Sequence, residues 1–202
     1  DLLAPVIPAF LDNDNPEAVA SRLREISSEL IVADLVVVES RLRRLETELK
    51  RAPRAERVES EREQALLVSL QEDLEAGNHL GGLEIGDRDR IVLSGFGFLT
   101  LKPAVVLINT GEGAVAGWDR LVGLVSEIWP YPNTAAAAIS AQIEGEAHQL
   151  EPDDRRELLD SYGITGSATQ RVSQAVYDAT STSTAYTWNA SQVQAWPFPT
   201  GT

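Results

Sequence analysis

Asn109 and Glu112 follow a short uncharged run and are the residues of this chain best placed for ligand chemistry. The run, residues 105–108, is aliphatic and mostly β-branched, which is typical of a strand buried on both faces of a parallel α/β sheet. Ligands of such sheets bind beyond the carboxyl ends of the strands, where Asn109 is expected. Because an Asn-x-x-Glu match is short and common, a polar turn after a core strand is the structural alternative.

A second pattern overlaps the first and points to different chemistry. Residues 111–116, Gly-Glu-Gly-Ala-Val-Ala, fit the G-x-G-x-x-A pattern of dinucleotide-binding folds between a predicted strand and a predicted helix. The acidic residue that would hold a ribose about 20 positions further on is missing, since Tyr131, Pro132 and Asn133 stand there. A dinucleotide site is therefore the less favoured alternative, and binding of NADH would test it.

Other residues with reactive side chains are interpreted as structural. His79 lies in a Gly-rich loop and His148 on a polar helix, and neither has a second histidine at metal-ligand spacing. Acidic residues near helix starts, such as Glu144, Asp153 and Asp154, are expected to complement helix dipoles while staying solvated. The sequence thus predicts no metal site and no catalytic residue.

Composition narrows the class of protein. The chain has 202 residues, a formal net charge of −14 and no cysteine, which excludes disulfides, zinc–thiolate sites and cysteine nucleophiles. No long apolar run or signal-peptide pattern is present, so we expect a cytoplasmic protein without a membrane partner. The first residue is Asp1 rather than methionine, and we expect the chain to start inside a longer gene product or to have been processed.

The acidic net charge opposes general nucleic-acid binding, yet one segment is locally basic. Between residues 41 and 57, three acidic residues stand against seven basic ones, which are Arg41, Arg43, Arg44, Lys50, Arg51, Arg54 and Arg57. Such a segment can meet phosphate. The structural alternative is a solvated helix face that carries intrahelical ion pairs.

The basic segment lies at the centre of a predicted helical hairpin. Residues 17–50 show a helical pattern with a heptad seam made by Ile31, Leu35, Val38, Leu42, Leu45 and Leu49. Such a seam requires a partner helix. Pro53 interrupts the pattern, and residues 56–76 form a second helical segment with Leu67, Leu70 and Leu74 on one stripe. The short connection favours an antiparallel hairpin within the chain, with the basic residues at its tip.

The hydrophobic patterns of the remaining segments alternate between those of strands and those of helices. Residues 2–10 predict an interrupted strand because Pro5 and Pro8 each remove a ladder donor. Further along, residues 118–128 predict a helix, the alanine-rich residues 134–139 a buried strand, and residues 180–188 and 192–198 two strands joined around 189–191. Helices are predicted at 142–150, 152–162 and 169–179. This order predicts an α/β protein into which the helical hairpin is inserted.

Four stretches resemble the YchF or Obg-like ATPases, which are P-loop nucleotide-binding proteins of the translation-factor class. Residues 26–35 resemble that family's Ile-Asn-x-Glu-Leu-x-Leu-Ala-Asp-Leu segment, and residues 99–112 its Leu-Thr-x-Lys-Pro strand and Asn-x-x-Glu turn. Residues 139–144 are similar to its Ile-Ser-Ala-Lys-Ile-Glu segment. Ala195 and Trp196, with the Gly-Thr of 201–202, look like the opening of its TGS domain.

The resemblance implies a partial P-loop NTPase (G-domain) layer with an inserted antiparallel α-helical coiled coil and the start of a β-grasp TGS domain. The corresponding boundaries are 1–15 for a strand of the nucleotide-binding domain and 16–98 for the coiled-coil region. The C-terminal part of the nucleotide-binding domain is expected at 99–180, and the start of the TGS domain at 181–202.

The resemblance also implies a purine site. Asn109 would recognise the purine edge, and Ser140 and Ala141 would offer a hydroxyl and a backbone N–H near the base. Glu112 occupies the position where classical GTPases have aspartate, which favours ATP over GTP. The expected ligands are therefore ATP or GTP, with Mg in the full-length protein, and the hairpin tip is expected to contact the ribosome or other RNA.

Several sequence motifs of the family are missing from this chain. The phosphate loop, Gly-x-x-x-x-Gly-Lys-Ser/Thr, is absent, as are the family's magnesium-holding threonine segment and its Asp-x-x-Gly turn, and all three are expected upstream of Asp1. The family's His-Val-x-Gly-x-Val-Asp-Pro linker is reduced to residues 12–16. We therefore expect this chain alone to be inactive in hydrolysis and to bind nucleotide weakly at best. The alternative is a non-catalytic coiled-coil/TGS interaction module.

Overall fold

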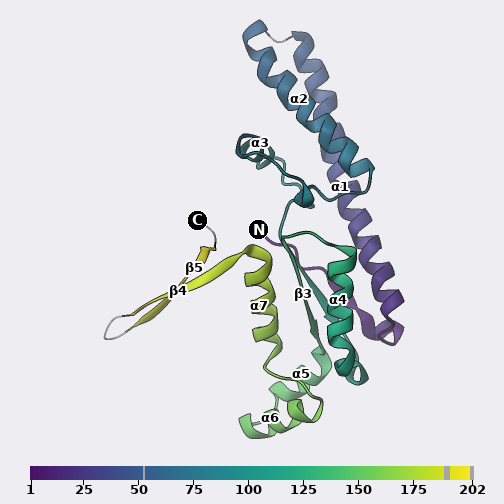
Figure 1. The fold of residues 1–202 in the computed structure, drawn as a ribbon, viewed down its shortest axis with the longest axis vertical. Coiled ribbons are helices and arrows are strands. Elements are labelled where there is room, and N and C mark those ends of the chain that lie inside the picture. Colours follow the sequence, from purple (N-terminus) through teal and green to yellow (C-terminus); the bar gives the residue numbers. More distant parts are fainter. Residues whose placement is uncertain (52, 189–191, 201–202) are drawn as a thin grey trace. The chain divides into compact units, whose positions relative to one another are not determined.

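A computed structural model describes residues 1–51, 53–188 and 192–200 (Figure 1). The chain divides into two compact units, an α/β unit made of Asp1–Arg24 and Pro103–Thr202, and a hairpin unit made of Glu25–Lys102. Helix α1 (Pro16–Arg51) begins in the first unit and ends in the second. The domain roles assigned from the sequence stay predictions.

The α/β unit is built on three parallel strands. Strands β1 (Val6–Pro8), β2 (Ala104–Asn109) and β3 (Thr134–Ile139) lie in the order β1-β2-β3. Leu107 of β2 is in register with Val6 and with Ala137, and all the pairings are parallel. The prediction of an α/β fold with residues 105–108 in a buried parallel strand is confirmed, and β1 is as short as its prolines require.

Two helices pack against β3 and explain its alanines. Helices α4 (Trp118–Ile128) and α7 (Ala168–Thr180) lie on either side of β3 (Figure 1). Ala137 of the strand packs with Ala175 and Ala179 of α7 in one buried cluster. Small side chains on both surfaces let the helix approach the sheet closely, so packing overrides the helical preference of an alanine run. The predicted strand at 134–139 is confirmed.

Shorter elements complete this unit. Turns of 3-10 helix, η1 (Ala9–Asp12) and η3 (Glu112–Gly117), follow β1 and β2, and α5 (Ala141–His148) and α6 (Pro152–Ser161) follow β3. Strands β4 (Thr182–Trp188) and β5 (Val193–Pro199) pair antiparallel, as predicted. The turn expected at 189–191 and the Gly-Thr pair at 201–202 lie outside the described residues.

The hairpin unit is held by the predicted seam. Helix α2 (Arg54–Glu75) runs antiparallel to α1, and Arg41 of α1 donates two hydrogen bonds, of 2.7 and 2.8 Å, to Glu63 of α2. Buried seam residues of both helices form one cluster, to which η2 (Leu80–Gly82) and α3 (Asp87–Leu93) add Leu80 and Leu93. The cluster includes Ile31, Val38, Leu45, Leu67, Leu70 and Leu74. The pairing of the two stripes within the chain is confirmed.

A buried carboxylate ties the end of this unit to α1. Asp34 is 1% exposed, and it accepts hydrogen bonds from the backbone N–H groups of Leu99 and Thr100, each at 2.8 Å. The Thr100 hydroxyl donates a third bond at 2.7 Å. The charge of Asp34 is thus stabilised by donors from a segment far along the chain.

Among the described helices, none combines the length and the apolar character that crossing a membrane requires.

Candidate functional site

Asn109 is the last residue of β2 and lies at the carboxyl end of the sheet, as predicted. It is in register with Ile139, the last residue of β3. Its side-chain Oδ1 accepts a hydrogen bond of 3.0 Å from the backbone N–H of Ala141, the first residue of α5. This bond fixes the amide plane. Asn109 is half-buried, and its Nδ2 group has no hydrogen bond to any described residue. A donor is therefore left over for a ligand.

Ser140 and Ala141 lie beside Asn109, but their polar groups are arranged differently from the expectation. Ser140 is 0% exposed, and its hydroxyl has no hydrogen-bond partner among the described residues. It occupies the N-cap position of α5 without a side-chain cap bond. The Ala141 N–H, expected to face the base, is already donated to Asn109. In this structure Ala141 therefore orients Asn109, and neither the buried Ser140 hydroxyl nor the Ala141 N–H is available to a base.

Glu112 opens η3 with its side chain exposed. Its Oε1 accepts a hydrogen bond of 2.6 Å from Nε2 of Gln142 in α5, and its Oε2 accepts one of 3.4 Å from the hydroxyl of Tyr162. The negative charge of Glu112 raises the pKa of Tyr162 above its ordinary value, because the phenolate would lie beside a carboxylate. Asn109 and Glu112 thus both face α5 and the residues around it.

The two residues between them have partners of their own. The hydroxyl of Thr110 donates to the Ile139 carbonyl at 3.2 Å and accepts from the Trp118 indole N–H at 2.8 Å. The N–H of Gly111 donates to both carboxylate oxygens of Asp14, at 3.0 and 3.2 Å. A Cβ at position 111 would lie 3.0 Å from Asp14 Oδ2, so glycine suits this close approach. Every residue of the turn is thus held by a separate contact.

Asp14 was missed by sequence reasoning. It follows Asn13, and both have positive φ angles, 53° for Asn13 and 56° for Asp14. Asn and Asp tolerate the left-handed region best among residues other than glycine, so the polar turn at 12–16 contained the available signal. Its partner Gly111 lies 97 residues away, and no local pattern reveals such a pairing.

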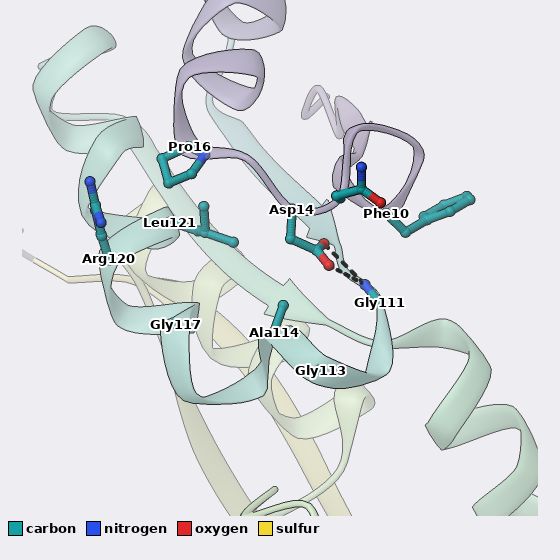
Figure 2. A pocket seen from close by; sticks show the side chains of 10 residues that line it. Phe10, Asp14, Pro16, Gly111, Gly113, Ala114, Gly117, Arg120 and Leu121 are labelled. Carbon is teal, nitrogen blue, oxygen red and sulfur yellow. Dashed lines mark hydrogen bonds between the residues drawn. The ribbon is translucent and has the colours of Figure 1, made fainter.

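A cavity of about 590 Å³ lies against the turn on the side of Asp14 (Figure 2). Asp14 and Gly111, joined by their hydrogen bonds, line the cavity, and Pro16, Ala114 and Leu121 supply apolar walls. Arg120 stands at the rim (Figure 2). None of the four residues predicted to bind a base lines this cavity. The cavity is therefore not the site that the sequence predicted.

The glycine-rich turn at 111–116 does not lead directly into an α-helix, as a dinucleotide-binding site would require. The glycines at 111 and 113 lead into η3, and α4 begins only at Trp118. In a dinucleotide fold the glycine-rich turn opens the α-helix directly, so that the helix N-terminus faces the pyrophosphate. The spacing in this chain separates the glycines from that helix.

Glu144 corrects one expectation from the sequence. We expected it to be solvated, whereas its side chain is only 14% exposed and forms an ion pair with Arg171 of α7. Its carboxylate also accepts a hydrogen bond from the N–H of Ala168. Arg171 further stacks over Trp118, with its guanidinium carbon 4.9 Å from the ring centroid. Glu144 therefore joins α5 to α7.

The two histidines belong to different units, His79 to the hairpin unit and His148 to the α/β unit. His79 is 5% exposed, and its Nε2 lies 2.7 Å from the Ser27 hydroxyl. Burial lowers the pKa of His79, which favours the neutral ring. His148 ends α5 and is exposed.

The predicted phosphate-contacting residues do not form a uniform set. The side chain of Arg41 is 22% exposed and forms ion pairs with Glu63 and Glu48. The hydrogen bond with Glu63 raises the pKa of Arg41 above its ordinary value. Arg41 is thus engaged within the hairpin. The exposed members are Arg43, Arg44, Lys50, Arg51 and Arg57. The side chain of Arg54 lies outside the described residues.

Comparisons with known proteins agree on one relationship. No protein-family model matches the chain. "Ribosome-binding ATPase YchF" from Pasteurella multocida is 27% identical over 207 residues, covering 100% of this chain and 55% of that protein. The Bacillus subtilis protein of the same name is 27% identical, covering 100% of this chain and 56% of its own length. The chain therefore spans about half the length of these curated relatives.

A solved structure shows the same fold. The YchF GTPase of Schizosaccharomyces pombe superposes with a TM-score of 0.80 at 20% sequence identity, over 100% of this chain and 56% of that one. The resemblance first drawn from four short stretches thus extends along every part of the chain. The chain is similar to YchF proteins over its entire length, and its resemblance to the YchF family is confirmed.

Proposed function

We propose that this chain forms the base-recognition part of a cytoplasmic purine-nucleotide-binding protein of the YchF type, which binds ATP in preference to GTP and associates with the ribosome. In this proposal the three parallel strands belong to a P-loop NTPase layer. The helical hairpin is the family's coiled-coil insertion, and β4 and β5 begin a TGS domain. The similarity to ribosome-binding YchF ATPases supports these assignments.

The observation that carries the proposal is the position of Asn109. Its amide stands at the carboxyl end of β2, is oriented by the Ala141 N–H at 3.0 Å, and keeps Nδ2 for a purine acceptor. Glu112 adds an exposed carboxylate on the same turn. A fixed amide next to an exposed carboxylate matches the mixed donors and acceptors of a purine edge.

Hydrolysis requires groups that these 202 residues do not contain. Phosphoryl transfer depends on a backbone cradle, a lysine and Mg²⁺ around the β- and γ-phosphates, and no Gly-x-x-x-x-Gly-Lys-Ser/Thr sequence is present. The Mg-dependent chemistry is therefore assigned to the full-length protein. We propose that the chain alone does not hydrolyse nucleotide and that it binds the base weakly.

Calorimetry with ATP and GTP tests this part of the proposal. The expected result is no heat of binding at micromolar ligand, together with millimolar affinity detected by NMR as shifts of the Asn109 and Ala141 amide signals. Micromolar binding would contradict the assignment of phosphate affinity to groups outside the chain. The absence of any purine effect at several millimolar would contradict the base site itself.

The exposed basic residues of the hairpin tip are proposed to contact ribosomal RNA. Arg43 is a suitable member because its side chain is 72% exposed and its ion pair with Glu39 is long, at 4.0 Å. Reversing the charge of Arg43, Arg44, Lys50 and Arg51 should reduce co-sedimentation of the full-length protein with ribosomes. Reversing the exposed Arg156 of α6 gives a control. Unchanged co-sedimentation of the tip variant would refute this contact.

A non-catalytic interaction module is the second candidate function. The observation that favours it is the exposure of aromatic side chains on β4 and β5, 62% for Tyr186 and 54% for Trp196. The apolar seam is a poor surface for a partner, because Leu45 is 0% exposed within the hairpin. If Asn109→Ala leaves nucleotide-dependent ribosome co-sedimentation unchanged, the interaction module is preferred.

A further inference from the structure

The carboxylate of Glu112 is held from α5 in a way that the proposed function does not use. Gln142 donates from its Nε2 to Glu112 Oε1 at 2.6 Å and to Glu146 Oε1 at 3.4 Å. The Tyr162 hydroxyl donates to the other oxygen of Glu112 at the longer distance of 3.4 Å. Glu112 and Gln142 are both exposed, so a ligand can reach this group of side chains.

Guanine and adenine make different demands on such a carboxylate. Guanine presents two adjacent donors, N1–H and the N2 amine, which pair best with both oxygens of one carboxylate. Adenine presents one amine on the corresponding edge, and a single oxygen can accept from it. A carboxylate whose Oε1 is already engaged by a short, charge-assisted hydrogen bond must release or share that bond to accept guanine.

Resting on the proposed function, we propose that Gln142 is a specificity-determining residue, which holds Oε1 of Glu112 and thereby biases the purine site toward adenine. Gln142 sits at the position where the family segment resembled by residues 139–144 has lysine. Its amide donates to the carboxylate while leaving the charge in place. The bias therefore arises from the occupied oxygen and not from neutralisation of Glu112.

The experiment compares AMP with GMP on the whole chain. Both nucleotides are titrated to several millimolar, and the dissociation constants are taken from backbone and side-chain amide shifts in ¹H–¹⁵N NMR spectra. The wild-type chain is expected to bind AMP more tightly. Gln142→Leu, which removes the amide donor and leaves an apolar side chain one atom shorter, should raise GMP affinity relative to AMP by about three- to tenfold, as expected for loss of a solvent-exposed bond to a charged group.

Two further variants isolate the effect. Gln149→Leu makes the same side-chain change at the exposed C-cap of α5, away from Glu112, and should leave the AMP-to-GMP ratio unchanged. Tyr162→Phe removes the longer contact at 3.4 Å and should move the ratio less than Gln142→Leu. Thermal unfolding of each variant verifies that the fold is intact, as expected for exposed or partly exposed positions.

The outcomes separate this inference from the proposed function. An unchanged ratio in Gln142→Leu, with purine binding retained, overturns the role of Gln142 and leaves the base site standing. A wild-type preference for GMP also overturns it. If the wild-type chain binds neither nucleotide at several millimolar, the proposed function fails, and the role of Gln142 fails with it. A shift toward GMP in Gln142→Leu alone supports the inference.

Discussion

Asp34 of α1 in the hairpin unit and Glu112 in the turn after β2 are both carboxylates that accept hydrogen bonds from distant parts of their own unit. Asp34 is 1% exposed and receives two backbone N–H groups and a hydroxyl at 2.7–2.8 Å. Glu112 is exposed and receives two side-chain donors, of which only the bond from Gln142 is short. The contrast separates a structural carboxylate from one available to a ligand.

The difference follows from solvation. A buried charge is tolerated only when its hydrogen bonds are made within the protein, so Asp34 and the donors from Leu99 and Thr100 depend on each other. An exposed carboxylate exchanges partners with water at little cost. A ligand-binding polar group therefore needs an exposed or partly exposed position such as that of Glu112 or Asn109. A polar group that stabilises the fold can occupy a buried position such as that of Asp34.

The largest expected effect comes from breaking the anchor. Asp34→Ala leaves two buried donors of Thr100 and the partly buried N–H of Leu99 without an acceptor, at about 1–3 kcal/mol for each unpaired group, with some relief from water entering the space. The free energy of unfolding should fall by about 3–5 kcal/mol, measured by urea denaturation. The hairpin unit should lose amide protection in hydrogen exchange before the α/β unit does.

Glu29→Ala serves as the control for this change. Glu29 is an exposed acid on the same helix, and its replacement should alter stability by no more than about 0.5 kcal/mol. Equal destabilisation by Glu29→Ala and Asp34→Ala would show that helix α1 responds to charge alone, and the distinction between the two carboxylates would be lost.

The next largest effect is expected in the apolar seam between α1 and α2. Leu45 is 0% exposed between α1 and α2, so Leu45→Ala should cost about 2–4 kcal/mol through lost burial and the cavity left behind. Val36, on the same helix, is 59% exposed, and Val36→Ala should change stability by less than about 0.5 kcal/mol. Similar urea midpoints for the two variants would contradict the packing of the seam.

Local periodicity explains why the seam and the sheet could be predicted. The spacing of Leu45 and its neighbours, and the β-branched run ending at Asn109, are properties of contiguous sequence. The partners of the polar residues are not. Asp34 and Leu99 are 65 residues apart, and Glu112 and Gln142 are 30 apart. Such pairings depend on how the elements pack, so the sequence could place the turn but not the residues that hold it.

The same argument explains the arrangement of Ser140 and Glu144. The sequence places Ser140 at the end of a strand, where a hydroxyl could meet a ligand, but its complete burial depends on how α5 packs. Glu144 was expected in solvent because it lies near a helix start, and its ion pair with Arg171 depends on α7. Burial of a polar residue on a short polar helix is a tertiary property.

A smaller effect on stability, with a large effect on binding, is expected at the turn. Asn109→Ala removes one hydrogen bond to a partly exposed N–H, so it should cost only about 1 kcal/mol in urea denaturation. It should, however, abolish the AMP-induced NMR shifts around Ala141. Asn78→Ala, which removes an exposed amide from the hairpin unit, should keep those shifts. A destabilisation as large as that of Asp34→Ala would make Asn109 an anchor as well.

The smallest expected effect is a pH dependence of the stability of the hairpin unit, which contains His79. Burial lowers the pKa of His79, while the charge of Asp34 partly opposes this shift. In the unfolded chain the histidine titrates near its ordinary pKa of about 6.5. The stability associated with neutral His79 is therefore complete above that pH, declines as the pH falls below it, and levels off below the lowered pKa of the folded state.

This dependence can be separated from the titration of carboxylates by a variant. His79→Gln keeps a polar side chain opposite the Ser27 hydroxyl but cannot titrate, so the decline in unfolding free energy between pH 7 and pH 5 should become shallower than in the wild type. Exposed His148 provides the matched control, because His148→Gln should retain the wild-type slope. If both variants reproduce that slope, the decline comes from other groups, and the buried ring of His79 is not what links the hairpin unit to pH.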